Sequence, residues 1–165
     1  MKFQRAVEFV LSQEGLYCND PNDPGGETKY GISKRSYPSL DIAMITLDQA
    51  VAIYRKDFWD KCKCEEMPYP VALAVFDAAV NQGVSASIRA LQKSLGVVVD
   101  GVIGTKTLAA ITETNSTMLL VELVAQRCVL YATLSTVKFY GLGWFRRVSL
   151  MHSTAMSEVK NKETK

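Results

Sequence analysis

Apolar residues recur three and four positions apart through most of this 165-residue chain, and clusters of Gly, Pro, Asn and Asp interrupt them. This spacing is typical of amphipathic helices, whereas the apolar residues of a half-buried strand alternate. About half of the residues (48%) are apolar, which is enough for the core of one compact domain. The pattern therefore predicts a mainly α-helical fold, with a structured loop at the turn-rich stretch 18–28.

The predicted helices follow from this spacing and from the residues that begin or end them. Phe3, Val7 and Val10 start an opening helix that Gly15 ends, and a capping box begins a second helix at Thr46. Further helices are expected at residues 70–83, 85–95, 105–112, 118–137 and 145–159, with a short hairpin at 28–32 and a frayed tail at 160–165. The 118–137 helix is expected to be the buried centre, and the glycines at 141 and 143 are expected to end it.

Charge and cysteine content exclude several classes of function. Lys and Arg number 19 against 17 Asp and Glu, a net charge of +2 that gives no strong attraction to nucleic acid. No run of eighteen uncharged apolar residues is present, so stable membrane insertion is not expected. Four cysteines and one histidine favour neither a disulfide scaffold nor a zinc site. Glu8 interrupts the first apolar stretch, so no secretory signal is expected and the cytosol is the default place of synthesis.

Glu14 is the first candidate catalytic residue. It follows Val10, Val7 and Phe3 by four, seven and eleven positions, so its carboxyl group is expected on the apolar side of the opening helix. Glu14 is also expected in the last helical turn, at the negative end of the helix dipole, and this dipole and poor solvation both favour the protonated acid. A carboxylic acid that keeps its proton near neutral pH is what general acid catalysis needs.

The loop after Glu14 supplies further carboxyl groups at Asp20, Asp23 and Glu27, and a hydroxyl group at Thr28. Glycosidic cleavage needs two carboxyl groups in different environments, because one protonates the bridging oxygen and the other activates water or stabilises positive charge on the sugar. The alternative is that the aspartates bond their own turn and that Glu14 faces solvent. The residue pattern alone leaves both interpretations open.

A longer stretch of the sequence favours the catalytic interpretation of these carboxyl groups. The stretch EGLYCNDPNDPGGETKYGI at residues 14–32 resembles the signature of family 108 glycoside hydrolases, the phage and prophage muramidases. The similarity continues through YRKDFW, FDAAVNQG, LQ at 91–92, DGVIGTKT and GWFRRV, up to about residue 148. It implies that Glu14, which matches the Glu of the motif Glu-Gly-Gly-Tyr, is catalytic, although Leu16 stands where the second glycine is usual. It also implies a lysozyme-like catalytic region at residues 1–95 and a peptidoglycan-binding region at 96–165 packed against it.

The second catalytic residue is predicted by similarity to phage lysozymes with a related helical fold. Those enzymes separate a Glu, an Asp and a Thr by eight and then five residues. Here eight residues separate Glu14 from Asp23, but only four separate Asp23 from Thr28. Asp23 therefore ranks above Asp20. Thr28 either holds the attacking water or bonds the backbone of the turn, and both roles are open.

Substrate contacts are expected from Asp20, Tyr30, Tyr69, Asn81 and Gln82. Asp77 and Asn81 lie four positions apart on one helical face, so Asn81 can reach a sugar acetamido group while Asp77 supports the loop. Tyrosines can stack on sugar faces, although aromatic residues at helical positions more often belong to the core. Arg146 and Arg147 are expected either to attract the anionic wall polymer or to form a solvated face.

These observations predict a lysozyme-like endolysin that cleaves the β-1,4 bond between N-acetylmuramic acid and N-acetylglucosamine in peptidoglycan glycan strands, without a metal or an organic cofactor. Two alternatives stay open: a lytic transglycosylase, and a wall-binding or secretion accessory protein without catalysis. Because no export signal is expected, a phage holin or a bacterial secretion system would have to give the protein access from the cytoplasm to the periplasm and cell wall.

Overall fold

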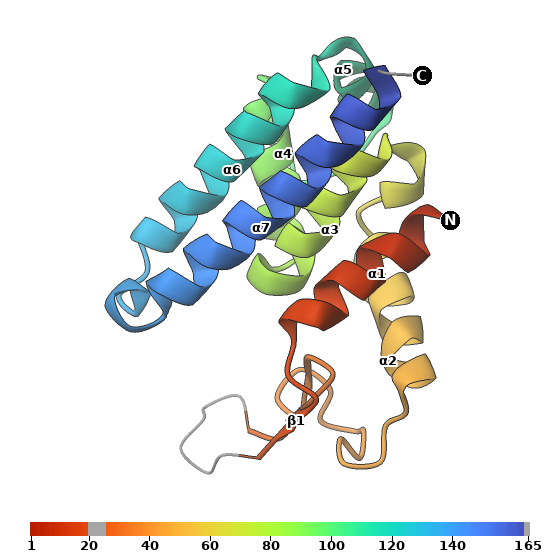
Figure 1. The fold of residues 1–165 in the computed structure, drawn as a ribbon, viewed down its shortest axis with the longest axis vertical. Coiled ribbons are helices and arrows are strands. Elements are labelled where there is room, and N and C mark those ends of the chain that lie inside the picture. The colour runs from red at the N-terminus through yellow and green to blue at the C-terminus, as the bar shows by residue number, and fades with distance from the viewer. Residues whose placement is uncertain (20–25, 164–165) are drawn as a thin grey trace.

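The computed structural model describes residues 1–19 and 26–163. Within these ranges the chain is mainly α-helical, as the apolar spacing predicts, and it carries a small three-stranded antiparallel sheet (Figure 1). The α-helices are α1 Lys2–Gln13, α2 Leu47–Tyr54, α3 Tyr69–Gln82, α4 Val84–Ser94, α5 Thr105–Glu113, α6 Ser116–Ala132 and α7 Val137–Glu163. The strands are β1 Tyr17–Cys18, β2 Thr28–Lys29 and β3 Ile32–Ser33. A π-helical turn at Arg55–Trp59 and a 3₁₀ turn at Cys64–Glu66 follow α2.

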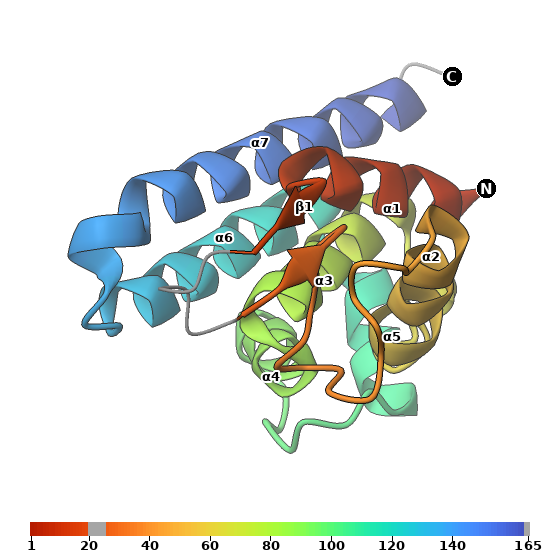
Figure 2. The ribbon, with the colours of Figure 1, turned by 90° about the horizontal axis from the view of Figure 1, so that it is seen from below.

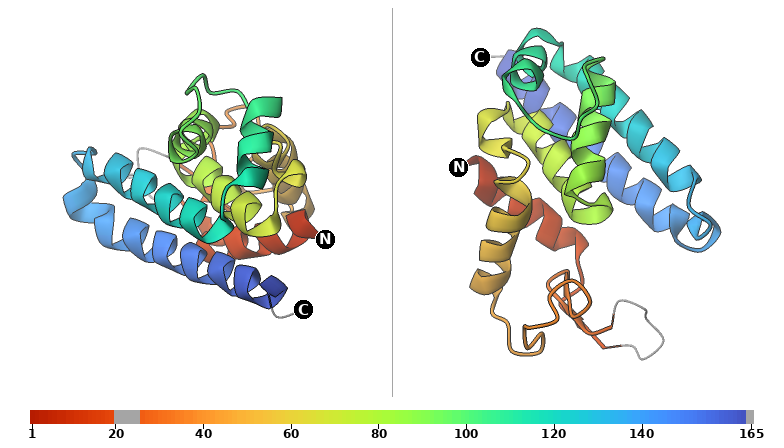
Figure 3. Two further views of the ribbon diagram at one scale, coloured as in Figure 1. Left: turned by 90° about the horizontal axis from the view of Figure 1, so that it is seen from above. Right: turned by 180° about the vertical axis from the view of Figure 1, so that it is seen from behind.

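The centre of the fold is α3. Every residue from 69 to 79 is buried, as expected of a helix that is surrounded by protein on all sides. Helices α1 and α7 cover one side of α3, and α4 and α5 lie on the other (Figure 2, Figure 3). The prediction that residues 118–137 form the central helix is therefore wrong. Helix α6 buries one face, with Leu119, Leu123 and Tyr131, and exposes Val121 and Val129.

Helix α7 runs without a break through both glycines that are expected to interrupt it. Each glycine in a helix interior disfavours the helix by about 1 kcal/mol, and packing of α7 against α3 and α6 outweighs this. Gly141 is buried, and a Cβ atom there would lie 3.0 Å from Cγ2 of Val137, so a small residue suits the position. Residues 160–163, expected to fray, continue the helix, whereas α6 ends at Ala132 instead of residue 137.

The sheet follows α1 directly and contains the predicted hairpin. Strands β2 and β3 pair with Lys29 opposite Ile32, which leaves Tyr30 and Gly31 as a two-residue turn. Both turn residues have positive φ, 51° and 77°, the combination found in tight hairpin turns. The N–H of Tyr30 donates to the carbonyl of Leu16 at 3.1 Å. This hydrogen bond brings the turn back to the end of α1, and the pairing of β1 with β2, which the sequence pattern does not predict, strengthens the connection.

The helix boundaries predicted from capping residues at Thr46 and Gly96 are confirmed. The hydroxyl of Thr46 accepts from the amide of Gln49, and the side chain of Gln49 accepts from the amide of Thr46. Gly96 follows α4 with φ of 66°. In the described ranges no single helix is long and apolar enough to span a bilayer, and α5 and α6 meet that test only together, as a pair bent by 118°.

Candidate active site

Glu14 is the first residue beyond α1. Its backbone is extended, with φ −98° and ψ 147°, and its N–H donates to the carbonyl of Leu11. The prediction that Glu14 lies in the last helical turn is therefore wrong, and its carboxyl group does not have the purely apolar surroundings expected. Nη1 of Arg147 donates to Oε1 of Glu14 at 2.6 Å, and the Glu14 side chain is 22% exposed. A cation thus fixes one carboxyl oxygen, while the group still reaches solvent.

The hairpin turn packs directly against Glu14, and this approach requires glycine at position 31. A Cβ atom on Gly31 would lie 2.9 Å from Cγ of Glu14 and would overlap the hydroxyl of Tyr54. Oη of Tyr54 donates to the carbonyl of Tyr30 at 2.8 Å and holds the turn in place. Burial raises the pKa of Tyr54, and the nearby Glu14 carboxylate raises it further, so the phenol keeps its proton.

A pocket of about 500 Å³ opens beside this turn. Gly31 and Tyr54 form one part of its wall, and Tyr37, Asp57, Lys61 and the end of α3 contribute to the rest. Oη of Tyr37 donates to Oδ2 of Asp57 at 3.0 Å, and Nζ of Lys61 lies 3.0 Å from Oδ1. The bond from Lys61 lowers the pKa of Asp57, which stays ionised. The wall of this pocket thus combines apolar side chains with polar groups that are held in fixed orientations.

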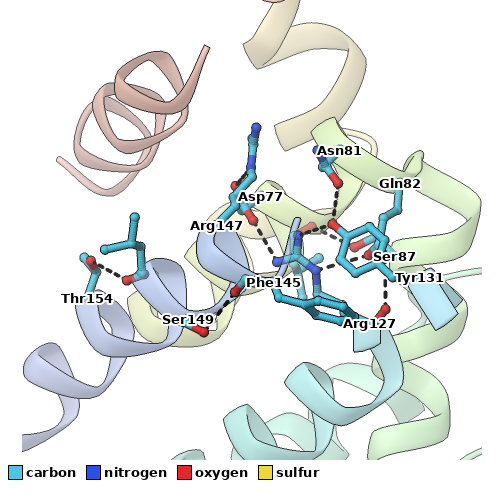
Figure 4. Close-up of polar contacts among 12 residues, drawn as sticks. Asp77, Asn81, Gln82, Ser87, Arg127, Tyr131, Phe145, Arg147, Ser149 and Thr154 are labelled. Carbon is cyan, nitrogen blue, oxygen red and sulfur yellow. Dashed lines mark hydrogen bonds and ion pairs between the residues drawn. The ribbon is translucent and has the colours of Figure 1, made fainter. Parts of the chain in front are cut away.

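Arg127 and Arg147 form a connected cluster with the carboxylates of Asp77 and Glu14. Oδ1 of Asp77 accepts from Nε of Arg147 at 2.8 Å, and Oδ2 accepts from Nη1 of Arg127 at 2.7 Å (Figure 4). The Asp77 and Arg127 side chains are 0% and 1% exposed, so these charges have to be balanced locally. When Glu14 is ionised, the formal charges of the two arginines and the two carboxylates cancel. Burial lowers the pKa of Arg147, but the charges of Asp77 and Glu14 outweigh burial and raise it, so the guanidinium stays charged.

Arg127 also holds two residues at the end of α3 that are predicted to contact substrate. Its Nε donates to Oε1 of Gln82 at 3.1 Å, and its Nη2 donates to the hydroxyl of Tyr131 at 3.4 Å. That hydroxyl donates in turn to Oδ1 of Asn81 (Figure 4). Tyr131 is buried and Asn81 is exposed, so the hydrogen bonds run from the core to the surface.

Asp20 and Asp23, predicted for substrate binding and catalysis, lie outside the described residues. Oγ1 of Thr28 donates to the carbonyl of Gly26 at 3.3 Å, a contact within the turn. Leu16, where the resemblance places a glycine, is 79% exposed and does not have a positive φ, so leucine fits without backbone strain. Across the described ranges, no three His, Cys, Asp or Glu side chains are grouped as metal ligands.

The two tyrosines predicted to stack on sugars lie in different places. Tyr30 occupies the hairpin turn beside Glu14 and is partly exposed. Tyr69 begins α3 and is 8% exposed, with the Arg5 guanidinium 4.2 Å from its ring centroid. Arg5 lies roughly two and a half helical turns before Glu14. Tyr30 therefore belongs to the candidate site, whereas Tyr69 packs at the other end of α1.

Sequence reasoning missed Arg127 and gave Arg147 a different role. Arg127 follows Leu119 and Leu123 at intervals of four, so it lies on the buried face of α6. A charge on an apolar helical face is a signal of a buried partner, because an unpaired charge there is too poorly solvated. The partner is Asp77, 50 residues away, and no local spacing connects the two.

A mainly helical domain with a carboxylate at the end of its first helix, beside a small antiparallel sheet and a pocket, has the arrangement of a lysozyme-like glycosidase. The sequence profile of the family described as Glycosyl hydrolase 108 matches residues 7–83. Among solved structures, SagA of Brucella abortus is similar to this chain: the two are 34% identical, the TM-score is 0.87, and the match covers 94% of each chain. A comparison with curated proteins finds no match. The chain belongs to the glycosyl hydrolase 108 family, which indicates a glycoside hydrolase that acts on peptidoglycan.

Proposed function

We propose that this protein hydrolyses the β-1,4 bond between N-acetylmuramic acid and N-acetylglucosamine, with Glu14 as the general acid. The observation that carries the proposal is the position of Glu14. Arg147 binds its Oε1, and its carboxyl group reaches solvent next to the hairpin turn that lines the pocket. Oε2 is then the oxygen that delivers the proton to the glycosidic oxygen.

Arg147 supports this proton transfer electrostatically. When Glu14 gives up its proton it becomes a carboxylate in a partly buried position, and Nη1 of Arg147 already lies 2.6 Å from it. A charge that is fixed in place before the reaction stabilises a developing anion without reorganisation. Asp77 holds Nε of the same guanidinium at 2.8 Å, so Arg147 does not have to be reoriented during the reaction.

Asp23 is the second carboxylate of the proposal and orients a water on the opposite face of the sugar. This role of Asp23 is supported by the eight residues that separate it from Glu14 in the sequence. Thr28 assists through the lone pairs of Oγ1, because the hydroxyl proton is directed at the carbonyl of Gly26. The anomer of the first product distinguishes inversion through activated water from retention through attack by a carboxylate.

Peptidoglycan glycan strands are the proposed substrate. Asp20, Tyr30, Asn81 and Gln82 contact the sugars in this proposal, and residues 96–165 add affinity for the wall. The reaction needs carboxyl groups and water, and no metal or organic cofactor. Because the substrate lies outside the inner membrane, we propose that a holin or a secretion system gives the protein access from the cytoplasm to the periplasm and cell wall.

Digestion of purified sacculi tests the proposal. The wild-type protein is expected to release muropeptides with reducing muramic ends, detected by mass spectrometry, and Glu14→Gln is expected to abolish the release. Glu122→Gln, the same change at an exposed position on α6, is the matched control and is expected to stay active. Anhydro-muramic ends would identify a lytic transglycosylase instead. Binding to sacculi without any release, unchanged in Glu14→Gln, would identify a wall-binding protein without catalysis.

A further inference from the structure

Arg127 is 1% exposed, and three of its nitrogen atoms have different partners. Nη1 donates to Asp77, Nε to Gln82 and Nη2 to Tyr131 (Figure 4). A buried ion pair is weak evidence for stability, because well-packed apolar residues of similar volume often stabilise a fold equally well. The contacts of Arg127 therefore point to a role in orienting its partners.

One branch of these contacts leads to the general acid. Arg127 fixes Oδ2 of Asp77, and Oδ1 of Asp77 accepts from Nε of Arg147. Because a guanidinium is planar, fixing its Nε also sets the direction of its Nη atoms. Nη1 of Arg147 then meets Oε1 of Glu14. The orientation of the acid thus depends on a residue that does not touch it.

The other branch leads to Asn81. Arg127 donates to the hydroxyl of Tyr131, so the proton of this hydroxyl is directed to Oδ1 of Asn81. Burial raises the pKa of Tyr131, which keeps the phenol in its donating form. Because Oδ1 of Asn81 accepts this hydrogen bond, the NH₂ group of the Asn81 side chain is the part that can donate to a substrate.

We propose that Arg127 is a positioning residue that fixes Glu14 and Asn81 relative to each other. Through Asp77 and Arg147 it sets the orientation of the acid. Through Tyr131 it makes Asn81 a hydrogen-bond donor toward the substrate, suited to a carbonyl oxygen such as that of a sugar acetamido group. This inference rests on the proposed function, since it gives Arg127 a part in the same reaction.

Three variants separate the branches in the muropeptide-release assay. Tyr131→Phe removes only the hydroxyl and is expected to raise KM about tenfold while kcat stays near the wild-type value. Asp77→Asn weakens the link to Arg147 and is expected to lower kcat about 100-fold with a smaller change in KM. Arg127→Lys keeps the charge but cannot bind three partners in one plane, so it is expected to change both constants.

Ser87→Ala is the matched control for lost stability. Ser87 is buried on α4 and donates to the carbonyl of Val75 on α3 at 2.7 Å, outside the Arg127 contacts. It is expected to lower Tm and to leave KM and kcat unchanged. The inference is overturned if Arg127→Lys and Tyr131→Phe lower Tm in the same way and keep wild-type KM and kcat.

If Arg127→Lys does not fold, Tyr131→Phe decides: an unchanged KM overturns the inference, and a raised KM with unchanged kcat supports it. Wild-type protein that releases no muropeptides would overturn the proposed function, and this inference with it. If the wild-type protein is active and the variants keep its KM and kcat, the role of Arg127 is overturned and the proposed function stands.

Discussion

Arg147 donates to the carboxylate of Glu14 across 133 residues of sequence. Glu14 lies at the end of the first helix and Arg147 on the last, so the pair forms only when α1 and α7 both pack on α3. Asp77, on α3, holds the guanidinium from the core side. The orientation of an acid at the edge of the fold is thus determined by the most buried helix.

Arg147→Lys is expected to lower kcat about 100-fold, because an ammonium group does not bind two carboxylates with the planar geometry of a guanidinium. The free energy of unfolding should also fall by about 3 kcal/mol, since buried Asp77 loses a partner. Muropeptide release and urea unfolding measure the two effects. The exposed neighbour offers a control, Arg146→Lys. Equal activity in the two variants would contradict the role of Arg147.

Gly31→Ala is expected to reduce activity at least about tenfold, because the new methyl group displaces Glu14 or Tyr54. Gly96→Ala is the matched control: Gly96, after α4, also has a positive φ, 66°, but a Cβ atom there meets nothing within 4 Å. Both variants should lose about 1 kcal/mol of stability from the unfavourable φ, and Gly31→Ala should lose more. Thermal unfolding and muropeptide release give the comparison. Similar losses of activity in both would show that the contact with Glu14 is unimportant.

Stability is expected to fall as the pH rises above about 10, the ordinary pKa of tyrosine. The pKa of Tyr54 is raised in the folded protein, so above this pH the unfolded chain releases a proton that the folded chain keeps. The free energy of unfolding then decreases by up to about 1.4 kcal/mol per pH unit for this group. Tyr54→Phe should remove this part of the slope, and Tyr140→Phe, at an exposed position, should not. Urea unfolding at several alkaline pH values checks the prediction, which fails if both variants keep the wild-type slope.

Leu16→Gly restores the glycine usual at this position and is expected to change kcat little, because the Leu16 side chain is 79% exposed and its backbone is unstrained. Glycine adds freedom to the unfolded chain, so the free energy of unfolding should drop by about 0.5 kcal/mol. Urea unfolding and muropeptide release measure both quantities. A large gain in kcat would show that leucine distorts the turn after Glu14.

Local signals predicted much of the fold. Helix α4 and the start of α2 follow from Gly96 and Thr46, whose preferences depend on the backbone beside them. The course of α7 did not follow, because tertiary packing overrides the weak helix propensity of Gly141. The end of α6 was missed because no Gly or Pro directly follows Ala132 to mark it. The strand β1 is two residues long and has no period to detect.

The candidate site was predictable only in part, for a similar reason. Glu14 is identified by a motif that is contiguous in sequence. Its partner Arg147, and Arg127 behind Asp77, come from helices far along the chain, and a single sequence gives their burial but not their pairing. The expectation of an apolar niche for Glu14 failed because it considered α1 alone.

The pairing of the first and last helices has a consequence for synthesis. On the ribosome, Glu14 is synthesised long before α7. Until α7 is complete, the Glu14 carboxyl group lacks its hydrogen bond from Arg147. With Glu14 as the proposed general acid, activity is therefore expected only after translation has completed the last helix. A fragment truncated ahead of Val137 is expected to be inactive for the same reason, because it lacks Arg147.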